Sequence, residues 1–224
     1  MRTAALATAV YVLVAGCGTI KGRAVLPHTP SMIPRPLVER DLDGLLLTPD
    51  QVNVAMGATA MMIVNANTTM SDNSATMAPP ECLALDGAAE AKVYADSGFQ
   101  AEREQSLNDG DHFTHYLKQT VVVFPTVDTA GAFLNRSVRQ WPACHDYTHT
   151  QSGTHWTVGP ITNTDGAMSA TTIEQNASGP GWGCGRTLVH TNNVIIDINT
   201  CSADPADSAL RIANQIAQNV AARW

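Results

Sequence analysis

Four cysteines that follow residue 80 constrain the fold more than any other feature of the sequence. Cys82, Cys144, Cys184 and Cys201 are even in number and widely spaced, which in an exported chain predicts two disulfides. Three pairings are possible, but Cys184 and Cys201 flank a segment typical of a strand hairpin, and this proximity favours joining them. That pairing leaves Cys82 with Cys144. A zinc site is the alternative, which the lack of a C-x2-C pair disfavours.

The first residues are typical of an export signal. Met1 and Arg2 give a positive start, and a run of small and aliphatic residues follows over residues 4–14, too short to span a bilayer. The run ends in Leu-Val-Ala-Gly-Cys, which resembles the bacterial lipobox and predicts a lipoprotein signal peptide over residues 1–16. We expect Cys17 to carry palmitate-like acyl chains that anchor the protein to the cell membrane at its extracytoplasmic face. An ordinary signal peptide followed by a chance cysteine is the alternative.

The rest of the chain divides into a tether and one domain. Residues 17–44 hold four prolines and little periodicity, which favours an extended, semi-rigid tether behind the acylated N-terminus. The folded domain is expected over residues 45–224. No segment after the signal approaches the roughly 20 apolar residues that a membrane span needs.

Composition excludes one class of partner. Thirteen Lys and Arg face twenty Asp and Glu, for a formal net charge of -7. This is the wrong sign for capture of a phosphate backbone, so no nucleic-acid partner is expected.

Several segments carry the signals of helices. The motif Thr-Pro-Asp-Gln at residues 48–51 is a capping box with proline at the first helical position, which predicts a helix to about residue 56. Residues 126–141 place their apolar side chains at helical spacing and are followed by proline. A last helix is expected to begin at residues 202–205 and to dock on a sheet through an apolar stripe. A short helix is predicted near residues 80–88.

Strand-like segments separate these helices, with a surface loop expected over residues 65–80. In one of them, we expect Phe113, His115 and Leu117 to share a face. Short turns rich in Gly, Asn and Asp join most of these segments, so neighbouring strands should be antiparallel. The fold class predicted is α+β, with an antiparallel sheet flanked by helices and two disulfides. The predicted strands are residues 92–95, 112–124, 155–158, 168–174, 186–189 and 194–198.

A series of short motifs runs along the predicted domain: LLLTPDQ at 45–51, AMG at 55–57, PEC at 80–82, VVFP at 122–125, RQWPAC at 139–144, WTVGP at 156–160, GWGC at 181–184 and NNV at 192–194. This series resembles the PknH-like extracellular sensor domain of mycobacteria, over residues 45–224. The resemblance implies the pairs Cys82–Cys144 and Cys184–Cys201, in agreement with the spacing. The family occurs as the outer domain of a membrane Ser/Thr kinase and as free-standing lipoproteins. This chain lacks kinase motifs and a membrane span after the signal, so phosphotransfer is not expected.

Seven histidines raise the question of a metal or acid–base site. His112 and His115 are three apart, so on a strand they would point to opposite faces. His145 and His149 are four apart and could share a face, but they lie in polar sequence where solvated histidines are common. We therefore expect no metal site and no cofactor.

The sequence also lacks the marks of an enzyme. No G-x-S-x-G elbow is present, and Ser152 stands outside a strand–turn–helix setting. The glycine-rich residues 179–185 lack the Lys-Ser/Thr continuation of a phosphate loop and suit a disulfide-anchored turn better. No catalytic residues are predicted.

Three tryptophans are candidates for a ligand platform or for the core. Trp141 and Trp156 are expected in the core, as aromatic side chains usually are. Trp182 lies among glycines and is the one expected on a loop.

These observations favour a non-catalytic, membrane-anchored lipoprotein that binds a small molecule or an envelope component as a sensor-type module. The ligand-binding residues are unknown at this stage. The alternative is a protein-interaction module that regulates an envelope partner. A deep apolar cleft would favour the first hypothesis and an exposed apolar patch the second.

Overall fold

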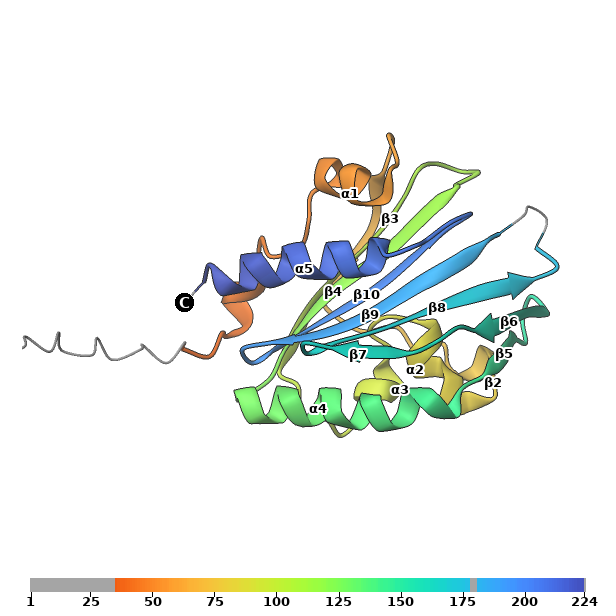
Figure 1. Cartoon of the computed structure of the whole chain (residues 1–224). Helices are drawn as coiled ribbons and strands as arrows, with labels where there is room; N and C mark the ends of the chain where they lie inside the picture. Colours follow the sequence, from red (N-terminus) through yellow and green to blue (C-terminus); the bar gives the residue numbers. More distant parts are fainter. Residues whose placement is uncertain (1–34, 178–180, 224) are drawn as a thin grey trace, which may run out of the picture. The chain divides into compact units, whose positions relative to one another are not determined.

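The computed structural model describes residues 35–177 and 181–223, and the predicted signal peptide and Cys17 lie outside these ranges. Within them, ten strands form one sheet in the order β1-β3-β4-β10-β9-β8-β6-β5-β2, with β7 paired to β8 (Figure 1). Every ladder is antiparallel, which confirms the predicted α+β class. The strands are β1 Met62–Asn67, β2 Met77–Ala78, β3 Ala101–Asn108, β4 His115–Val123, β5 Asp146–His149, β6 Thr154–Val158, β7 Thr162–Thr164, β8 Ala167–Gln175, β9 Gly183–Thr191 and β10 Val194–Ser202.

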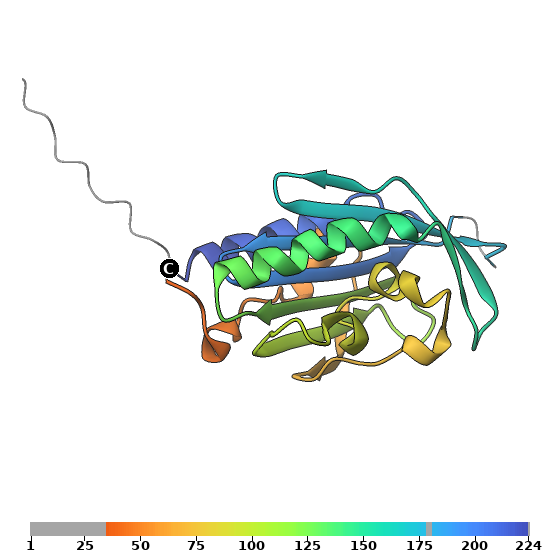
Figure 2. The same ribbon diagram turned by 90° about the horizontal axis from the view of Figure 1, so that it is seen from below.

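Helices cover both faces of this sheet. Figures 1 and 2 show α5 on one face and α4 on the other, with α2 and α3 on the side of α4. The α-helices are α1 Pro49–Met56, α2 Leu83–Asp86, α3 Ala91–Tyr94, α4 Val127–Gln140 and α5 Ser208–Ala221. Short 3-10 helices are η1 Glu39–Leu42, η2 Ser74–Thr76, η3 Pro80–Cys82 and η4 Trp141–Ala143.

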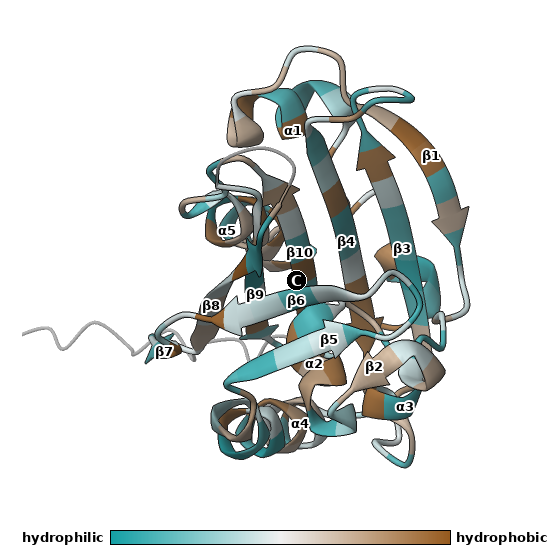
Figure 3. Cartoon of the chain, turned by 90° about the vertical axis from the view of Figure 1, so that its right-hand side faces the viewer, coloured by the Kyte–Doolittle hydropathy of each residue, from teal (hydrophilic) through white to brown (hydrophobic). Residues whose placement is uncertain are grey.

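The alternation of side chains along β10 divides the core into two clusters. Ile196 and Ile198 belong to the cluster under α5, which also contains Ile212 and Ile216 of that helix. Ile195 belongs to the second cluster, which contains the residues of α4 and the disulfides. Hydrophobic and hydrophilic segments follow one another along the strands in Figure 3.

Helix α1 was predicted correctly from local sequence signals. The backbone N–H of Thr48 donates to Gln51 Oε1 at 2.9 Å, and the backbone N–H of Gln51 donates to Thr48 Oγ1 at 3.4 Å. Gly57 ends α1 with a φ of 69°, a conformation that glycine adopts without strain. The prediction of a helix over residues 126–141 is confirmed by α4.

Both predicted disulfides are present. Cys82 and Cys144 join η3 to the residue that follows η4. Cys184 and Cys201 face each other on β9 and β10, across the hairpin whose turn is Asn192 and Asn193.

Several sequence predictions of secondary structure are wrong. Residues 92–95 fall mostly in α3 rather than in a strand, and the expected loop over residues 65–80 begins inside strand β1. Strand β3 was not predicted, because its sequence, AEREQSLN, is mostly polar. The last helix starts at Ser208 instead of residues 202–205, because β10 continues to Ser202.

The folded part also begins earlier than expected. Leu37 and Leu42, in the segment predicted to be a tether, are both 1% exposed and pack in the cluster under α5. The side chain of Asn193 accepts a hydrogen bond from the backbone N–H of Leu37 at 2.7 Å and donates to its carbonyl at 2.8 Å. This pair of bonds ties residue 37 to the β9–β10 turn.

Candidate binding cleft

A cleft of about 410 Å³ opens on the sheet face that α5 does not cover. Its size lies within the usual range of small-molecule sites, which is roughly 300 to 1,000 Å³. We call it the aromatic cleft. Its lining residues are Asn65, Asn67, Ser71, Asn73, Asp86, Gly87, Ala88, Glu90, Glu104, Ser106, Phe113, Tyr116, Lys118, His149, Trp156, Trp182, Cys184, Asn199 and Cys201.

Aromatic rings from three parts of the chain form one side of the cleft. Phe113, 44% exposed in the turn before β4, lies 6.2 Å from the ring of Trp182 and 6.2 Å from that of Tyr116. Trp156 of β6 stacks on Tyr147 with centroids 6.0 Å apart and nearly parallel planes. These contacts fix the positions of the rings independently of any ligand.

Charged and polar side chains of β3 and β4 also line the cleft. Lys118 Nζ lies 3.0 Å from Glu104 Oε2 and donates to Ser71 Oγ at 2.8 Å. The amide of Asn67 donates to Glu104 Oε1 at 3.1 Å. Glu104 is 4% exposed and Lys118 is 8% exposed, so this ion pair is shielded from bulk water.

Glu90 is a third charged group in the cleft. It accepts hydrogen bonds from the backbone N–H and the side-chain amide of Asn73, at 2.9 Å and 2.7 Å. Burial raises the pKa of Glu90, and the bonds from Asn73 partly offset that rise.

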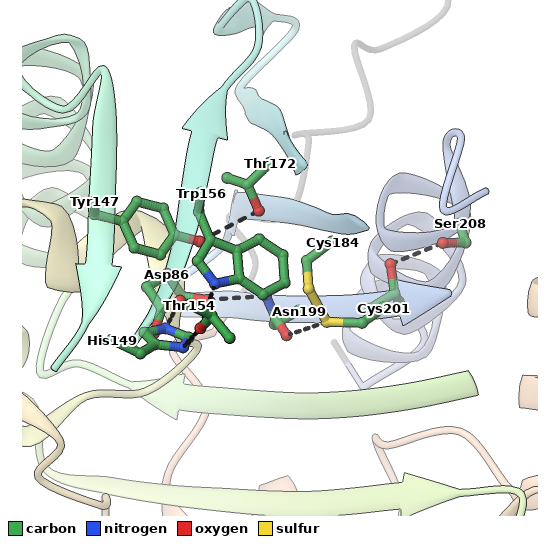
Figure 4. The surroundings of a disulfide bond; sticks show 11 residues. Asp86, Tyr147, His149, Thr154, Trp156, Thr172, Cys184, Asn199, Cys201 and Ser208 are labelled. Atoms are coloured by element: carbon green, nitrogen blue, oxygen red, sulfur yellow. Dashed lines mark hydrogen bonds and ion pairs between the residues drawn. A yellow bond between two sulfur atoms is a disulfide. The ribbon is translucent and has the colours of Figure 1, made fainter. Parts of the chain in front are cut away.

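Asp86 and His149 meet at the rim of the cleft, next to Trp156 (Figure 4). His149 Nε2 lies 2.8 Å from Asp86 Oδ1, and its Nδ1 lies 3.3 Å from Thr154 Oγ1. The hydrogen bond to Asp86 raises the pKa of His149. The Thr154 hydroxyl accepts a further bond from Trp156 Nε1 at 3.2 Å.

A buried ion pair supports the floor of the cleft. Arg186 of β9 pairs with Asp197 of β10, and both side chains are 2% exposed or less. Arg186 also donates to the carbonyls of Ala84 and Gly87, at 3.1 Å and 2.8 Å, and so holds α2 and the residue after it on the sheet. Asp197 accepts from the hydroxyl of Tyr94 at 2.9 Å.

Glu102 lies on the same face of β3 as Glu104 and is 1% exposed. Among the described residues, neither of its carboxylate oxygens has a hydrogen-bond partner. Burial, followed by the neighbouring charge of Glu104, raises the pKa of Glu102 to about 7.

The histidines singled out from the sequence do not come together. His115 Nδ1 pairs with Asp109 at 2.9 Å, while His112 precedes the strand in an exposed turn. His149 lines the aromatic cleft, whereas His145 is exposed and lines a separate cavity beside Val158. Within the described residues, no group of three or more His, Cys, Asp or Glu is arranged to hold a metal ion.

The tryptophan predictions agree with the structure. Trp141 and Trp156 are buried at 1% and 6% exposure, and Trp182 is only partly buried at the cleft. The role of Phe113 was missed, because it was assigned to a strand face with Leu117. Phe113 instead lies in the turn before β4, and Leu117 packs in the cluster under α5.

The fold agrees with what comparison with known proteins finds. A family model described as the PknH-like extracellular domain matches residues 37–219. The chain is 32% identical over 217 residues to the serine/threonine-protein kinase PknH of Mycobacterium tuberculosis (strain CDC 1551 / Oshkosh), a match that covers 95% of this chain and 34% of the kinase. It is 31% identical over 196 residues to PknH of Mycobacterium bovis (strain ATCC BAA-935 / AF2122/97), covering 85% of this chain and 33% of the kinase.

A solved structure extends the comparison to three dimensions. The crystal structure of the extracellular domain of PknH from Mycobacterium tuberculosis matches with a TM-score of 0.79 at 29% identity, covering 84% of this chain and 99% of that one.

The chain therefore belongs to the PknH-like extracellular domain family, as its sequence motifs predicted. Membership implies an extracytoplasmic location for the folded domain. The chain spans about one third of the length of the kinases it matches. Along residues 35–177 and 181–223, no helix is both long and apolar enough to cross a membrane.

Proposed function

We propose that this protein is a lipid-anchored, non-catalytic binding module that takes a small molecule or envelope component into the aromatic cleft. The observation that carries the proposal is the cleft itself, which is lined by aromatic rings held by contacts within the chain and by a buried polar cluster. Such concave sites with a few convergent polar groups are the usual form of ligand pockets. The name of the relatives, a kinase with an extracellular domain, supports a sensing role.

The position of the hydroxyl beside His149 supports a non-catalytic role. Among the described residues, Thr154 Oγ1 lies 3.3 Å from His149 Nδ1 and accepts a hydrogen bond from Trp156 Nε1. It is also not among the described residues that line the cleft. The pair of Asp86 and His149 therefore has no partner there that it could activate toward a bound ligand.

The binding function is tested with a thermal-shift scan of the full chain carrying Cys17→Ser, with both disulfides formed. Envelope sugars, lipids, peptides and divalent metals are the panel. A saturable rise in Tm that is lost in Trp182→Ala is expected, because a ligand that binds only the native state stabilises it. The proposal fails if no compound shifts Tm, or if the shift survives in Trp182→Ala.

The lipid anchor is tested separately on Cys17. Metabolic labelling with a palmitate analogue is expected to mark the protein in the membrane fraction, since two or more acyl chains give stable anchoring. Cys17→Ser should lose the label and appear in the soluble fraction. An unlabelled wild-type protein would favour the ordinary signal peptide.

An exposed apolar strand favours the alternative function, a protein-interaction module. Met62, Ile63 and Val64 are 52%, 44% and 52% exposed on β1, which lies at one end of the strand order. An edge strand with exposed apolar side chains can pair with another chain. Val64→Lys should abolish capture of an envelope partner if this alternative holds, and should leave ligand binding in the cleft unchanged.

A further inference from the structure

The charges of the aromatic cleft restrict the class of ligand it can take, provided that the binding function proposed above holds. Two of the three carboxylates that line it are paired with a basic side chain of the chain: Glu104 with Lys118, and Asp86 with His149. Glu90 is held by two hydrogen bonds from Asn73. Because a charged ligand would have to disrupt these pairs or remain unmatched in a shielded site, the cleft is suited to a neutral ligand.

The aromatic side of the cleft needs a ligand with an apolar face. Phe113 is 44% exposed and Trp182 is partly buried, with ring centroids 6.2 Å apart. Their planes are inclined at 50°, so the two rings offer two apolar faces at an angle, at little cost in side-chain entropy.

The remaining polar groups suit a ligand with several hydroxyls. The cleft presents the amide of Asn65 and the hydroxyls of Ser106 and Tyr116, which lie 3.4 Å apart, whereas the amide of Asn199 already donates to the carbonyl of Asp86 at 3.0 Å. An amide offers both donors and acceptors, and a hydroxyl can take either role, so these groups match hydroxyls better than they match ions. Asn65 is exposed on β1, and its side chain is free to reorient toward a ligand.

We propose that the aromatic cleft binds a neutral glycan, with the C–H face of a pyranose ring on Trp182, its edge against Phe113 and its hydroxyls toward Asn65 and Ser106. Among neutral ligands, a pyranose combines one apolar face with a rim of hydroxyls. A fatty acyl chain fits less well, because it would leave the buried pair of Lys118 and Glu104 against hydrocarbon.

Isothermal titration calorimetry on the full chain with Cys17→Ser tests the proposal against neutral oligosaccharides, uronic-acid oligosaccharides, short peptides and fatty acids. Saturable binding of a neutral oligosaccharide is expected. Trp182→Ala should weaken it at least tenfold and Asn65→Ala about threefold. Val54→Ala is the matched control, since Val54 is 83% exposed on α1 and does not line the cleft. Raising NaCl from 0.05 to 0.5 M should leave Kd within twofold, because salt screens charge–charge attraction only.

Each other outcome overturns a defined part of the proposal. A peptide or fatty acid whose binding depends on Trp182, with no glycan bound, overturns the glycan class and leaves the binding function intact. Glycan binding that resists both substitutions overturns the placement in this cleft. Equal or tighter binding of the acidic oligosaccharides, or a tenfold loss in salt, overturns the selection for a neutral ligand. No binding by any class overturns both this proposal and the binding function.

Discussion

The two faces of the sheet are stabilised by different chemistry, and the contrast is visible within one strand. On β10, Ile196 and Ile198 point to α5 and pack with Ile212 in a cluster of buried apolar side chains. Asp197, between them in sequence, points to the other face and pairs with the buried Arg186. The face under α5 is stabilised mainly by burial of apolar area, whereas the face under α4 combines its own apolar cluster with buried, matched charged groups.

This difference explains why the cleft lies where it does. Apolar side chains pack closely and leave few voids, and the face under α5 is filled in this way. A face that carries buried charges must instead match each of them in defined geometry. The contacts of Arg186 with the carbonyls of Ala84 and Gly87 hold α2 in place and leave space beside it for the aromatic cleft.

The largest effect is expected from breaking the buried ion pair. Asp197→Ala should lower the free energy of unfolding by about 3 to 5 kcal/mol, because Arg186 would be left buried without a counter-charge. The substitution also removes an acceptor from Tyr94 and from the backbone N–H of Ala89. Urea unfolding followed by circular dichroism measures the loss, with Asp197→Asn as the milder variant if the first does not fold.

A second substitution distinguishes the two faces. Ile212→Ala on the apolar face should lower the free energy of unfolding by about 2 to 5 kcal/mol through the cavity it leaves. No single substitution of a neighbouring residue should restore the lost stability.

The double variant Arg186→Met/Asp197→Leu tests the polar face. It should recover at least half of the stability lost in Asp197→Ala, since it removes both charges together. A double variant no more stable than Asp197→Ala would contradict this account of the polar face.

The next effect concerns the unpartnered carboxylate of Glu102. Its pKa is about 7 in the folded protein, above the ordinary value near 4.3 in an unfolded chain. The folded state therefore holds the proton more tightly, and stability should fall as pH rises from about 4.5 to about 7. Glu102→Gln should remove this loss, and above pH 7 it should stabilise the protein by up to about 3 kcal/mol.

Thermal unfolding of Glu102→Gln from pH 4 to pH 9 measures this effect. The variant and the wild type should match at pH 4 and diverge through the stated window. Glu81→Gln, at an exposed position in η3, is the control and should show no such divergence. An equal offset at every pH would mean that Glu102 acts through packing rather than through its charge.

The same contrast explains how much the sequence could predict. α1 was predicted from its local capping box and α4 from the helical spacing of its apolar residues. The disulfides were predicted from the proximity of Cys184 and Cys201 across a hairpin, in agreement with the family resemblance. The apolar stripe of α5 was also recognised, although its first residue was not.

The polar groups on the α4 side of the sheet could not be predicted from local sequence signals. Strand β3 buries Glu102 and Glu104, and polar side chains of this kind indicate a surface segment until the partner strand is known. Lys118 becomes a cleft residue only through its contacts with Glu104 and Ser71, which lie 14 and 47 positions away in sequence. A weak signal was available in β4, where polar residues recur within an otherwise apolar strand.

The smallest effect is expected at the rim of the cleft. Because the hydrogen bond to Asp86 raises the pKa of His149, the protonated imidazole stabilises the fold. That contribution is fully present below about pH 6.5, the ordinary pKa of histidine, and is lost as pH rises through the higher pKa of the folded state. His149→Gln should lower the free energy of unfolding by less than about 1 kcal/mol at pH 5.5, since the side chain is 30% exposed. It should have a smaller effect at pH 9, and His145→Gln, at an exposed position, should change neither value. NMR titration of the His149 imidazole gives the deciding measurement: a folded-state pKa at or below about 6.5, the ordinary value for histidine, would mean that Asp86 does not stabilise the cation, and that the rim contributes to the cleft by shape alone.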